Sequence, residues 1–350
     1  MNFDALNLAR PTIRRLRPYS SARSEFAGEA EVFLDANENA FGSPAGPTLN
    51  RYPDSMHGEL KRAIGKMNDI AVENIFVGNG SDEAIDLLIR IFCEPRTEGI
   101  IICPPTYGMY RVLAEINDVE VREAPLTEHY QLDRPAIDRV SDEKAKLLFI
   151  CSPNNPTGNL MNRMEILRIA EEFNGMVVVD EAYIHFADQG SMIRDIEDNP
   201  NLVVLQTFSK AWGMAGLRVG MAFADPKVVS LMNAVKPPYN VSTIAQRAVL
   251  EAIQDEVTVQ GWITDAIEQR DRLENELIQM PGIEKVHASD ANFVLVKVDR
   301  ARELYQFLID QRIVIRDRSN VMLCEGCLRI TVGTSAENSR LIAAMKEFEA

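Results

Sequence analysis

Lys210 stands among small and apolar residues in the stretch 208–220, which reads "FSKAWGMAGLRVG". An amine in apolar surroundings loses hydration, which favours its neutral, nucleophilic form and suits it to bond a carbonyl group as a Schiff base. Ser209 and Arg218 flank it, and a hydroxyl with a guanidinium is a natural pair for binding a phosphate. The stretch alone also fits a surface lysine at the start of a helix, so the role of Lys210 has to be judged from other residues.

A carboxylate follows the apolar run "MVVVDEAY" (residues 176–183), because Asp180 comes where a buried strand would end. A partly buried carboxylate needs a cationic partner, and a protonated pyridine nitrogen is one. Tyr183 could donate a hydrogen bond to a phenolic oxygen of the same ring. The alternative is that Asp180 caps the next helix or pairs with an arginine.

Two further loops follow expected strands. In "GNGSDEAID" (78–86), glycines precede Ser81, which we expect to cap a helix whose free N–H groups form an anion site. The alternative there is an ordinary capping box of Ser81 with Asp82 and Glu83. In "CSPNNPTGN" (151–159), prolines and asparagines force a sharp turn, and Asn155 can donate a hydrogen bond to a ligand.

Apolar runs that alternate with helical patterns place these loops along one edge of a sheet. The expected strands are 74–78, 99–103, 146–151, 176–180, 201–208 and 219–224, with helices such as 81–92 and 164–173 between them. Strands that are apolar throughout indicate a buried, mostly parallel sheet, that is, an α/β doubly wound core. Ligands bind such sheets beyond the carboxyl ends of the strands. An amine, an acid and a phosphate site together there point to pyridoxal 5′-phosphate.

The pattern changes after residue 236. Helical stretches at 242–253, 261–279, 301–311 and 337–349 alternate with strand candidates at 292–298 and 328–333, which predicts a smaller α+β domain. The first 45 residues lack a strand–helix rhythm, and we expect them to pack against it. The predicted division is therefore a large domain of residues 46–235 and a small domain of residues 1–45 together with 236–350.

Composition excludes several classes of function. The formal charge of −15 argues against nucleic acid or an anionic membrane surface as partner. No apolar run approaches the length of a membrane span, and the N-terminal residues do not resemble a secretory signal. Five scattered cysteines and four separated histidines form no metal-site or disulfide pattern, so we expect no metal and reduced thiols. These features favour a cytoplasmic location.

The motifs together resemble the fold-type I pyridoxal-phosphate aminotransferases and, among these, the histidinol-phosphate aminotransferases of histidine biosynthesis. The resemblance covers nearly the full chain and rests on segments in order: "LRPYSSAR", "LDANENAFG", "NRYPD", "GNGSDE", "CPPTYGMY", "SPNNPTG", "DEAY", "SKAWGMAGLRVG" and "CLRITVGT".

The resemblance implies a role for each matching residue. Lys210 would bond the cofactor aldehyde and then move the substrate proton, and Asp180 would keep the ring nitrogen protonated. Tyr107 would stack on the ring, while Asn155 and Tyr183 would bond its phenolic oxygen. The residues implied to hold the cofactor phosphate are Ser81, Asp82, Ser209, Arg218 and, from the other subunit of a homodimer, Tyr52.

The resemblance also implies how substrates bind. Arg329 of "CLRITVGT" would take the carboxylate of glutamate, and with Arg316 it would take the phosphate of histidinol phosphate. Two guanidiniums suit a dianion better than a monoanion. Tyr19 would line the same pocket and Asn37 its entrance. The alternative for Arg316 is a simple ion pair with Asp317.

The reaction expected from this resemblance is ping-pong transamination between histidinol phosphate and 2-oxoglutarate. Two activities on the same fold remain open, namely an aromatic-amino-acid aminotransferase and a threonine-phosphate decarboxylase. A non-catalytic regulator would need an added DNA-binding domain, and a phosphate-sugar binding module would not need Lys210.

Overall fold

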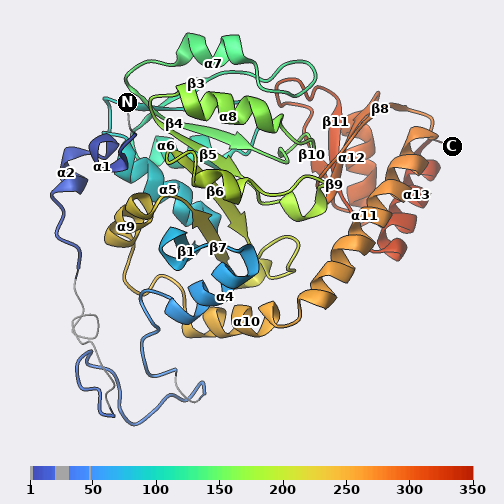
Figure 1. Cartoon of the computed structure of the whole chain (residues 1–350). Helices are drawn as coiled ribbons and strands as arrows, with labels where there is room; N and C mark the ends of the chain where they lie inside the picture. The colour runs from blue at the N-terminus through green and yellow to red at the C-terminus, as the bar shows by residue number, and fades with distance from the viewer. Residues whose placement is uncertain (1–2, 20–30, 47–48, 350) are drawn as a thin grey trace.

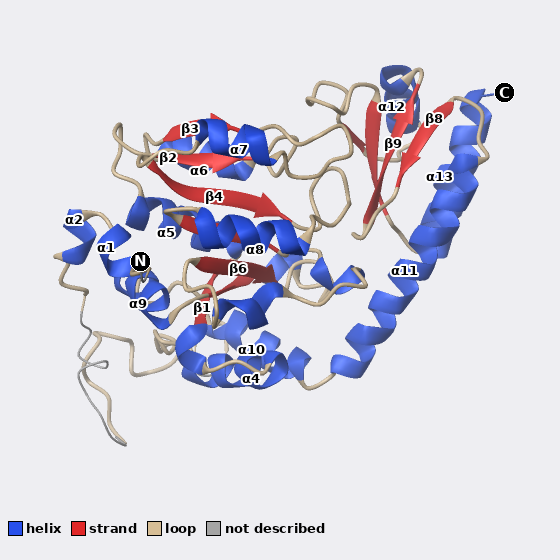
Figure 2. Ribbon diagram, turned by 45° about the horizontal axis from the view of Figure 1, so that its top comes forward, coloured by secondary structure: helices blue, strands red, loops and turns tan. Residues whose placement is uncertain are grey.

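The computed structural model describes residues 3–19, 31–46 and 49–349. Two sheets dominate it (Figures 1 and 2). The larger sheet has seven strands in the order β1-β7-β6-β5-β4-β2-β3, and the smaller has four in the order β10-β11-β9-β8. The predicted α/β architecture with a smaller α+β region is confirmed.

The large sheet is mostly parallel. Its strands are β1 (Ile75–Asn79), β2 (Gly99–Ile102), β3 (Glu120–Glu123), β4 (Ala145–Cys151), β5 (Met176–Asp180), β6 (Leu202–Thr207) and β7 (Val219–Phe223). Only β7 runs against its neighbours, pairing antiparallel with both β1 and β6. The first residue of β7 therefore lies at the edge where the other strands end. The central strands are buried, apart from the half-buried Lys146 in β4, because helices cover both faces.

One face of the large sheet is covered by α5 (Ser81–Phe92), α6 (Met109–Ile116) and α9 (Pro226–Val235), whose apolar side chains pack on strand residues such as Phe149. The opposite face is covered by α4 (Gly58–Asn68), α7 (Arg134–Val140), α8 (Arg163–Glu172) and α10 (Thr243–Ile253). Short 3₁₀ turns are η1 (Val72–Asn74), η2 (Ile184–Phe186), η3 (Met192–Ile196) and η4 (Ala215–Leu217). Helices on both faces make this sheet doubly wound.

The small sheet is wholly antiparallel. Its strands are β8 (Ile283–His287), β9 (Phe293–Val298), β10 (Arg316–Asp317) and β11 (Cys327–Thr331). One face packs on α11 (Glu256–Ile278), α12 (Ala301–Asp310) and α13 (Ser335–Glu349). The other face continues the core of the large sheet, because Phe293, Leu295 and Cys327 belong to that cluster. Alternate residues of β9 and β11 thus point to the two sides.

Two segments differ from the expected division of the chain. The short helices α1 (Ala5–Leu8) and α2 (Pro11–Arg14) lie on the large sheet's side, where Ala5 is buried beside α9 and Arg10 pairs with Glu94. These helices lie there because the apolar side chains of Ala5 and Ala9 pack in the buried cluster around α5. In addition, α10 packs against α4 rather than within the small domain. The long helix α11 then links the two parts (Figure 2).

Candidate active site

The cofactor-site residues predicted from the large sheet line one cavity. They are Ser81, Asp82, Tyr107, Asn155, Asp180, Tyr183, Ser209, Lys210 and Arg218, joined by Cys151, Ala182 and Thr207. These side chains follow β1, β2, β4, β5 and β6, or precede β7, so they meet at the carboxyl edge of the parallel strands. The cavity lies where an open α/β sheet binds its ligands.

Lys210 follows β6 by three residues and lies in a turn, with its carbonyl accepting from the N–H of Gly213 at 3.0 Å. No helix starts there, which removes the surface-helix alternative. Its Nζ lies 5.4 Å from the centre of the Tyr183 ring. The residue is exposed and lines the cavity. Partial desolvation by the surrounding protein, and secondarily the positive charge of Arg329, lowers the pKa of the Lys210 amine.

Asp180 ends β5 and is 3% exposed. Its Oδ2 accepts a hydrogen bond of 2.8 Å from the Tyr110 hydroxyl, and its Oδ1 accepts one of 3.1 Å from the N–H of Ala182. Burial raises the pKa of the carboxyl to about 6, although the Tyr110 hydrogen bond opposes that rise. Asp180 caps no helix and forms no ion pair with an arginine among the described residues. It therefore has capacity for a cationic ligand group.

Asn155 connects the two sheets. Its Nδ2 donates to the Tyr183 hydroxyl at 3.3 Å, and its Oδ1 accepts from Nη1 of Arg329, which comes from β11. Tyr183 packs edge-on against Phe293 of β9, with ring centres 5.1 Å apart. Arg329 is thereby joined to Asn155, one of the residues that line the cavity.

The amino end of α5 and Arg218 form a polar cradle. Helix α5 begins at Ser81 with Gly80 as its N-cap, and no side chain caps it. The expectation that Ser81 caps the helix is wrong, because its hydroxyl forms no such bond; Glu83 instead accepts from the N–H of Asn79. The first-turn N–H groups thus remain available for an anion.

Arg218 is held over that helix end. Its Nη1 donates to Ser209 Oγ at 3.3 Å, and its Nη2 lies 3.4 Å from Asp82 Oδ2. Tyr107 donates to the other oxygen of Asp82 at 3.1 Å. The cradle requires glycine at position 80, where φ is +77° and a Cβ would lie 2.7 Å from Arg218 Nη2.

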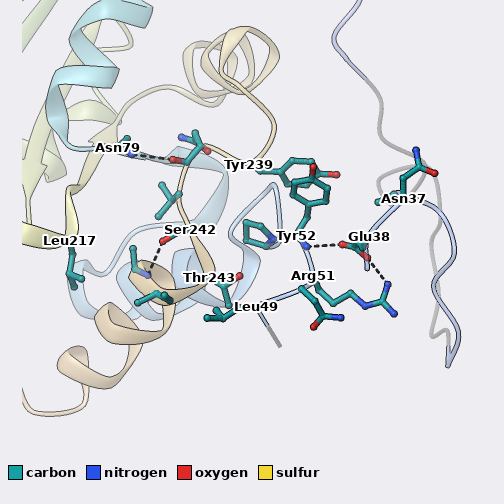
Figure 3. A pocket seen from close by; sticks show the side chains of 17 residues that line it. Asn37, Glu38, Leu49, Arg51, Tyr52, Asn79, Leu217, Tyr239, Ser242 and Thr243 are labelled. Carbon is teal, nitrogen blue, oxygen red and sulfur yellow. Dashed lines mark hydrogen bonds and ion pairs between the residues drawn. The ribbon is translucent and has the colours of Figure 1, made fainter. Parts of the chain in front are cut away.

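Tyr52 and Asn37 lie in a second, larger groove of about 670 Å³, outside the Lys210 cavity (Figure 3). The Tyr52 ring stacks on Tyr239, with centres 4.4 Å apart and planes inclined by 15°. Glu38 accepts hydrogen bonds from the Arg51 side chain and from the Tyr52 N–H. The structure therefore does not bring these two residues to the Lys210 cavity of the same chain.

The remaining predicted residues, Tyr19 and Arg316, are not among those that line the Lys210 cavity. Tyr19 is 73% exposed and lies in the segment that follows α2, outside any helix or strand. Arg316, in β10, stands directly opposite Arg329 in the sheet register. Its proposed pairing with Asp317 is absent among the described residues, because Asp317 accepts from the N–H and hydroxyl of Ser319.

Sequence reasoning missed two residues. Tyr110 touches Asp180, and Arg318 lies beside Arg316 and Arg329, whose charges affect its pKa. Tyr110 could have been suspected, since it lies in the first turn of α6, close after Tyr107. Arg318 could have been suspected from its alternation with Arg316.

Comparison with known protein families identifies the family to which the chain belongs. The profile of the family "aminotransferase class I and II" matches residues 25–345. The chain belongs to this family. Within the part of the chain that the structure describes, no helix is both long and apolar enough to cross a membrane.

Three related proteins are informative. A histidinol-phosphate aminotransferase of Cytophaga hutchinsonii is 48% identical over 99% of this chain and 100% of its own length. The crystal structure of a Sinorhizobium meliloti histidinol-phosphate aminotransferase in complex with pyridoxal 5′-phosphate has a TM-score of 0.80 at 24% identity, covering 89% of each chain. An L-threonine-O-3-phosphate decarboxylase structure from Porphyromonas gingivalis has a TM-score of 0.75 at 27% identity, covering 86% of this chain and 91% of its own.

Proposed function

We propose that this aminotransferase uses pyridoxal 5′-phosphate to exchange an amino group between L-histidinol phosphate and 2-oxoglutarate, giving imidazole-acetol phosphate and L-glutamate. The observation that carries the proposal is the common cavity of Lys210, Asp180, Asn155, Tyr183 and Arg218. The 48% identical relative of that name supports the choice of substrate.

The residues fit the cofactor. The buried Asp180 carboxyl has the capacity and the low-dielectric setting to pair with a protonated ring nitrogen. The cradle of Ser81, Ser209 and Arg218, kept open by Gly80, suits a phosphate. Asn155 and Tyr183 can donate to a phenolic oxygen, and Tyr107 can cover the ring.

Lys210 and Asp180 would have separate roles in the reaction. When bound, pyridoxal 5′-phosphate supplies a carbonyl that bonds the substrate amine and a ring that accepts electrons from the substrate carbon that bears this amine. Lys210 would hold the carbonyl and, once released, would take the proton from the substrate carbon. Its lowered pKa increases the fraction of neutral amine available as base. Asp180 would stay ionised because the ring cation compensates its burial.

Three finer assignments belong to this proposal. We propose that the enzyme is a homodimer in which Tyr52 contributes to the cofactor phosphate site of the partner subunit, since it does not reach the cavity of its own chain. We also propose that Tyr19 lines the substrate pocket and Asn37 its entrance only in that assembly. A cytoplasmic location is proposed from composition.

A substrate comparison tests the proposal against its rivals. Purified enzyme would receive L-histidinol phosphate, L-phenylalanine or L-threonine phosphate with 2-oxoglutarate, and both glutamate and carbon dioxide would be measured. We expect glutamate with histidinol phosphate at the highest kcat/KM, and no carbon dioxide. Preference for phenylalanine would favour an aromatic aminotransferase. Carbon dioxide without glutamate from threonine phosphate would favour the decarboxylase, whose fold is represented among the neighbours.

A further inference from the structure

Three arginines share one face of the small sheet. Arg316 lies opposite Arg329 in the register, and the N–H of Arg318 continues the ladder by donating to the Cys327 carbonyl at 2.9 Å. Alternation along a strand puts Arg316 and Arg318 on the same side. That side faces the large sheet, because Cys327 packs in the large sheet's core while Leu328 packs with α12 and α13.

Among the residues that the structure describes, no acid forms an ion pair with these three arginines. Asp317 alternates to the opposite face and bonds Ser319. The Arg318 side chain forms no hydrogen bond or ion pair with any described residue, and its Nε is buried without a partner. The Nε of Arg329 is likewise buried and has no hydrogen-bond partner within the described part of the chain. Unsatisfied, buried guanidinium donors cost stability unless a ligand takes them up.

Arg318 is half-buried and lies among other positive charges. Burial lowers the pKa of Arg318, and the neighbouring positive charges of Arg329 and Arg316 lower it further. Tyr183, which lines the Lys210 cavity, acts in the opposite direction and raises that pKa. Like charges held this close repel one another, so a multiply charged anion bound between them would stabilise the arrangement.

We infer that Arg318 is a third guanidinium of the substrate anion site and that it selects phosphomonoester dianions over carboxylates. This inference rests on the proposed function. A phosphate offers two charges and three terminal oxygens, enough for Arg316, Arg318 and Arg329 together. A carboxylate offers one charge and two oxygens, and Arg329 with one further donor satisfies it.

The test compares two substrates in one enzyme. In Arg318→Gln, kcat/KM for histidinol phosphate should fall about 10- to 100-fold, the effect of one charge-assisted hydrogen bond, while kcat/KM for glutamate should change less than about threefold. Arg318→Lys should recover part of the phosphate preference because it keeps the charge. Arg302→Gln is the matched control: it removes one exposed positive charge that bonds Asn320 in the same region, and it should leave both values unchanged.

A second readout uses inorganic phosphate in place of a phosphorylated substrate. Phosphate should inhibit the glutamate half-reaction competitively, and its inhibition constant should rise about 10-fold or more in Arg318→Gln but not in Arg302→Gln. Equal losses for both substrates, or an unchanged phosphate constant, would refute the role of Arg318. If the wild-type enzyme does not use histidinol phosphate at all, the proposed function fails instead. Preserved glutamate activity shows that the variant has folded.

Discussion

The hydroxyl of Tyr110 donates a 2.8 Å hydrogen bond to the buried carboxylate of Asp180. Both residues are withdrawn from solvent, and the Tyr110 ring stacks on Phe149 with centres 4.9 Å apart. The bond stabilises the charged form of Asp180 and so counteracts the burial that raises its pKa. Tyr110 is thus a positioning residue that keeps this acid ionised and oriented toward the cavity.

Replacing Tyr110 by phenylalanine should weaken the enzyme at low pH. The change keeps the stacking on Phe149 but removes the hydrogen bond, so the pKa of Asp180 should rise. The acid limb of kcat/KM against pH should therefore move upward by about one pH unit, as expected for a hydrogen bond to a charged group. An unmoved acid limb, with normal folding by circular dichroism, would show that Tyr110 does not tune Asp180.

Asp180 should carry a stability cost in the cofactor-free protein. Its folded-state pKa of about 6 exceeds its ordinary value of 3.8, so the folded state binds the proton more tightly and ionisation destabilises it as pH rises through that window. Asp180→Asn should thus be more stable than wild type at pH 8, by up to about 3 kcal/mol, with the difference vanishing below pH 4.

Chemical denaturation across that pH range, on cofactor-free protein, measures this difference. Glu347→Gln, on the exposed side of α13, is the control because it removes one surface carboxylate, and its free energy of unfolding should stay close to that of wild type. The same Asp180→Asn variant should lose transamination by about 100-fold or more, because it no longer compensates a ring cation. Lower stability of Asp180→Asn at pH 8 would contradict the account of the buried acid.

Gly80→Ala should weaken cofactor binding strongly while lowering the free energy of unfolding only slightly. Its Cβ would displace Arg218 from the cradle, and the left-handed backbone would cost about 1 kcal/mol. We expect the dissociation constant of pyridoxal 5′-phosphate, measured by fluorescence, to rise at least about 10-fold.

Gly261→Ala is the matched control for Gly80→Ala. Gly261 lies within α11 with open space at its Cβ, so alanine there should leave cofactor affinity unchanged and slightly stabilise the helix. Equal cofactor affinities for wild type and Gly80→Ala would remove the argument for the cradle.

Mixing two inactive variants tests whether Tyr52 acts across a dimer interface. Lys210→Ala lacks the amine and Tyr52→Ala lacks the ring, so each homodimer has two defective sites. A mixed dimer has one site with both groups if Tyr52 comes from the partner. Refolding an equal mixture should restore about a quarter of wild-type activity. No recovery, with mixed dimers demonstrated by mass spectrometry, would place Tyr52 outside the partner's site.

Most of the large sheet was predictable because its strands are continuous apolar runs. Two strands, one in each sheet, were harder to predict, and each has a physical cause. Strand β3 reads "EVRE" and lies at the sheet edge, where charged side chains reach solvent, so it carries no apolar signal. Strand β10 has two residues and is defined by pairing with β11 alone. The packing of α1 on α9 depends on tertiary contacts that spacing does not encode.

The candidate site was predictable where a residue ends a strand or lies in the loop that follows it. Lys210, Asp180 and Asn155 are of this kind, and they meet because parallel strands end at one edge. Arg218 joins them from the reversed strand β7, which only the sheet topology explains. The bond between Tyr110 and Asp180 joins residues 70 positions apart, so no local pattern announces it.

The most direct test of the central claim locates the covalent attachment of the cofactor. Enzyme incubated with pyridoxal 5′-phosphate would be reduced with borohydride, digested and sequenced by mass spectrometry. Lys236 and Lys61 serve as internal comparisons, because burial lowers the pKa of each to about 8 and so makes their amines reactive too. We predict the reduced adduct on Lys210 alone, and its loss from Lys210→Ala. An adduct on Lys236 or Lys61, with Lys210 unmodified in an active enzyme, would contradict the assignment.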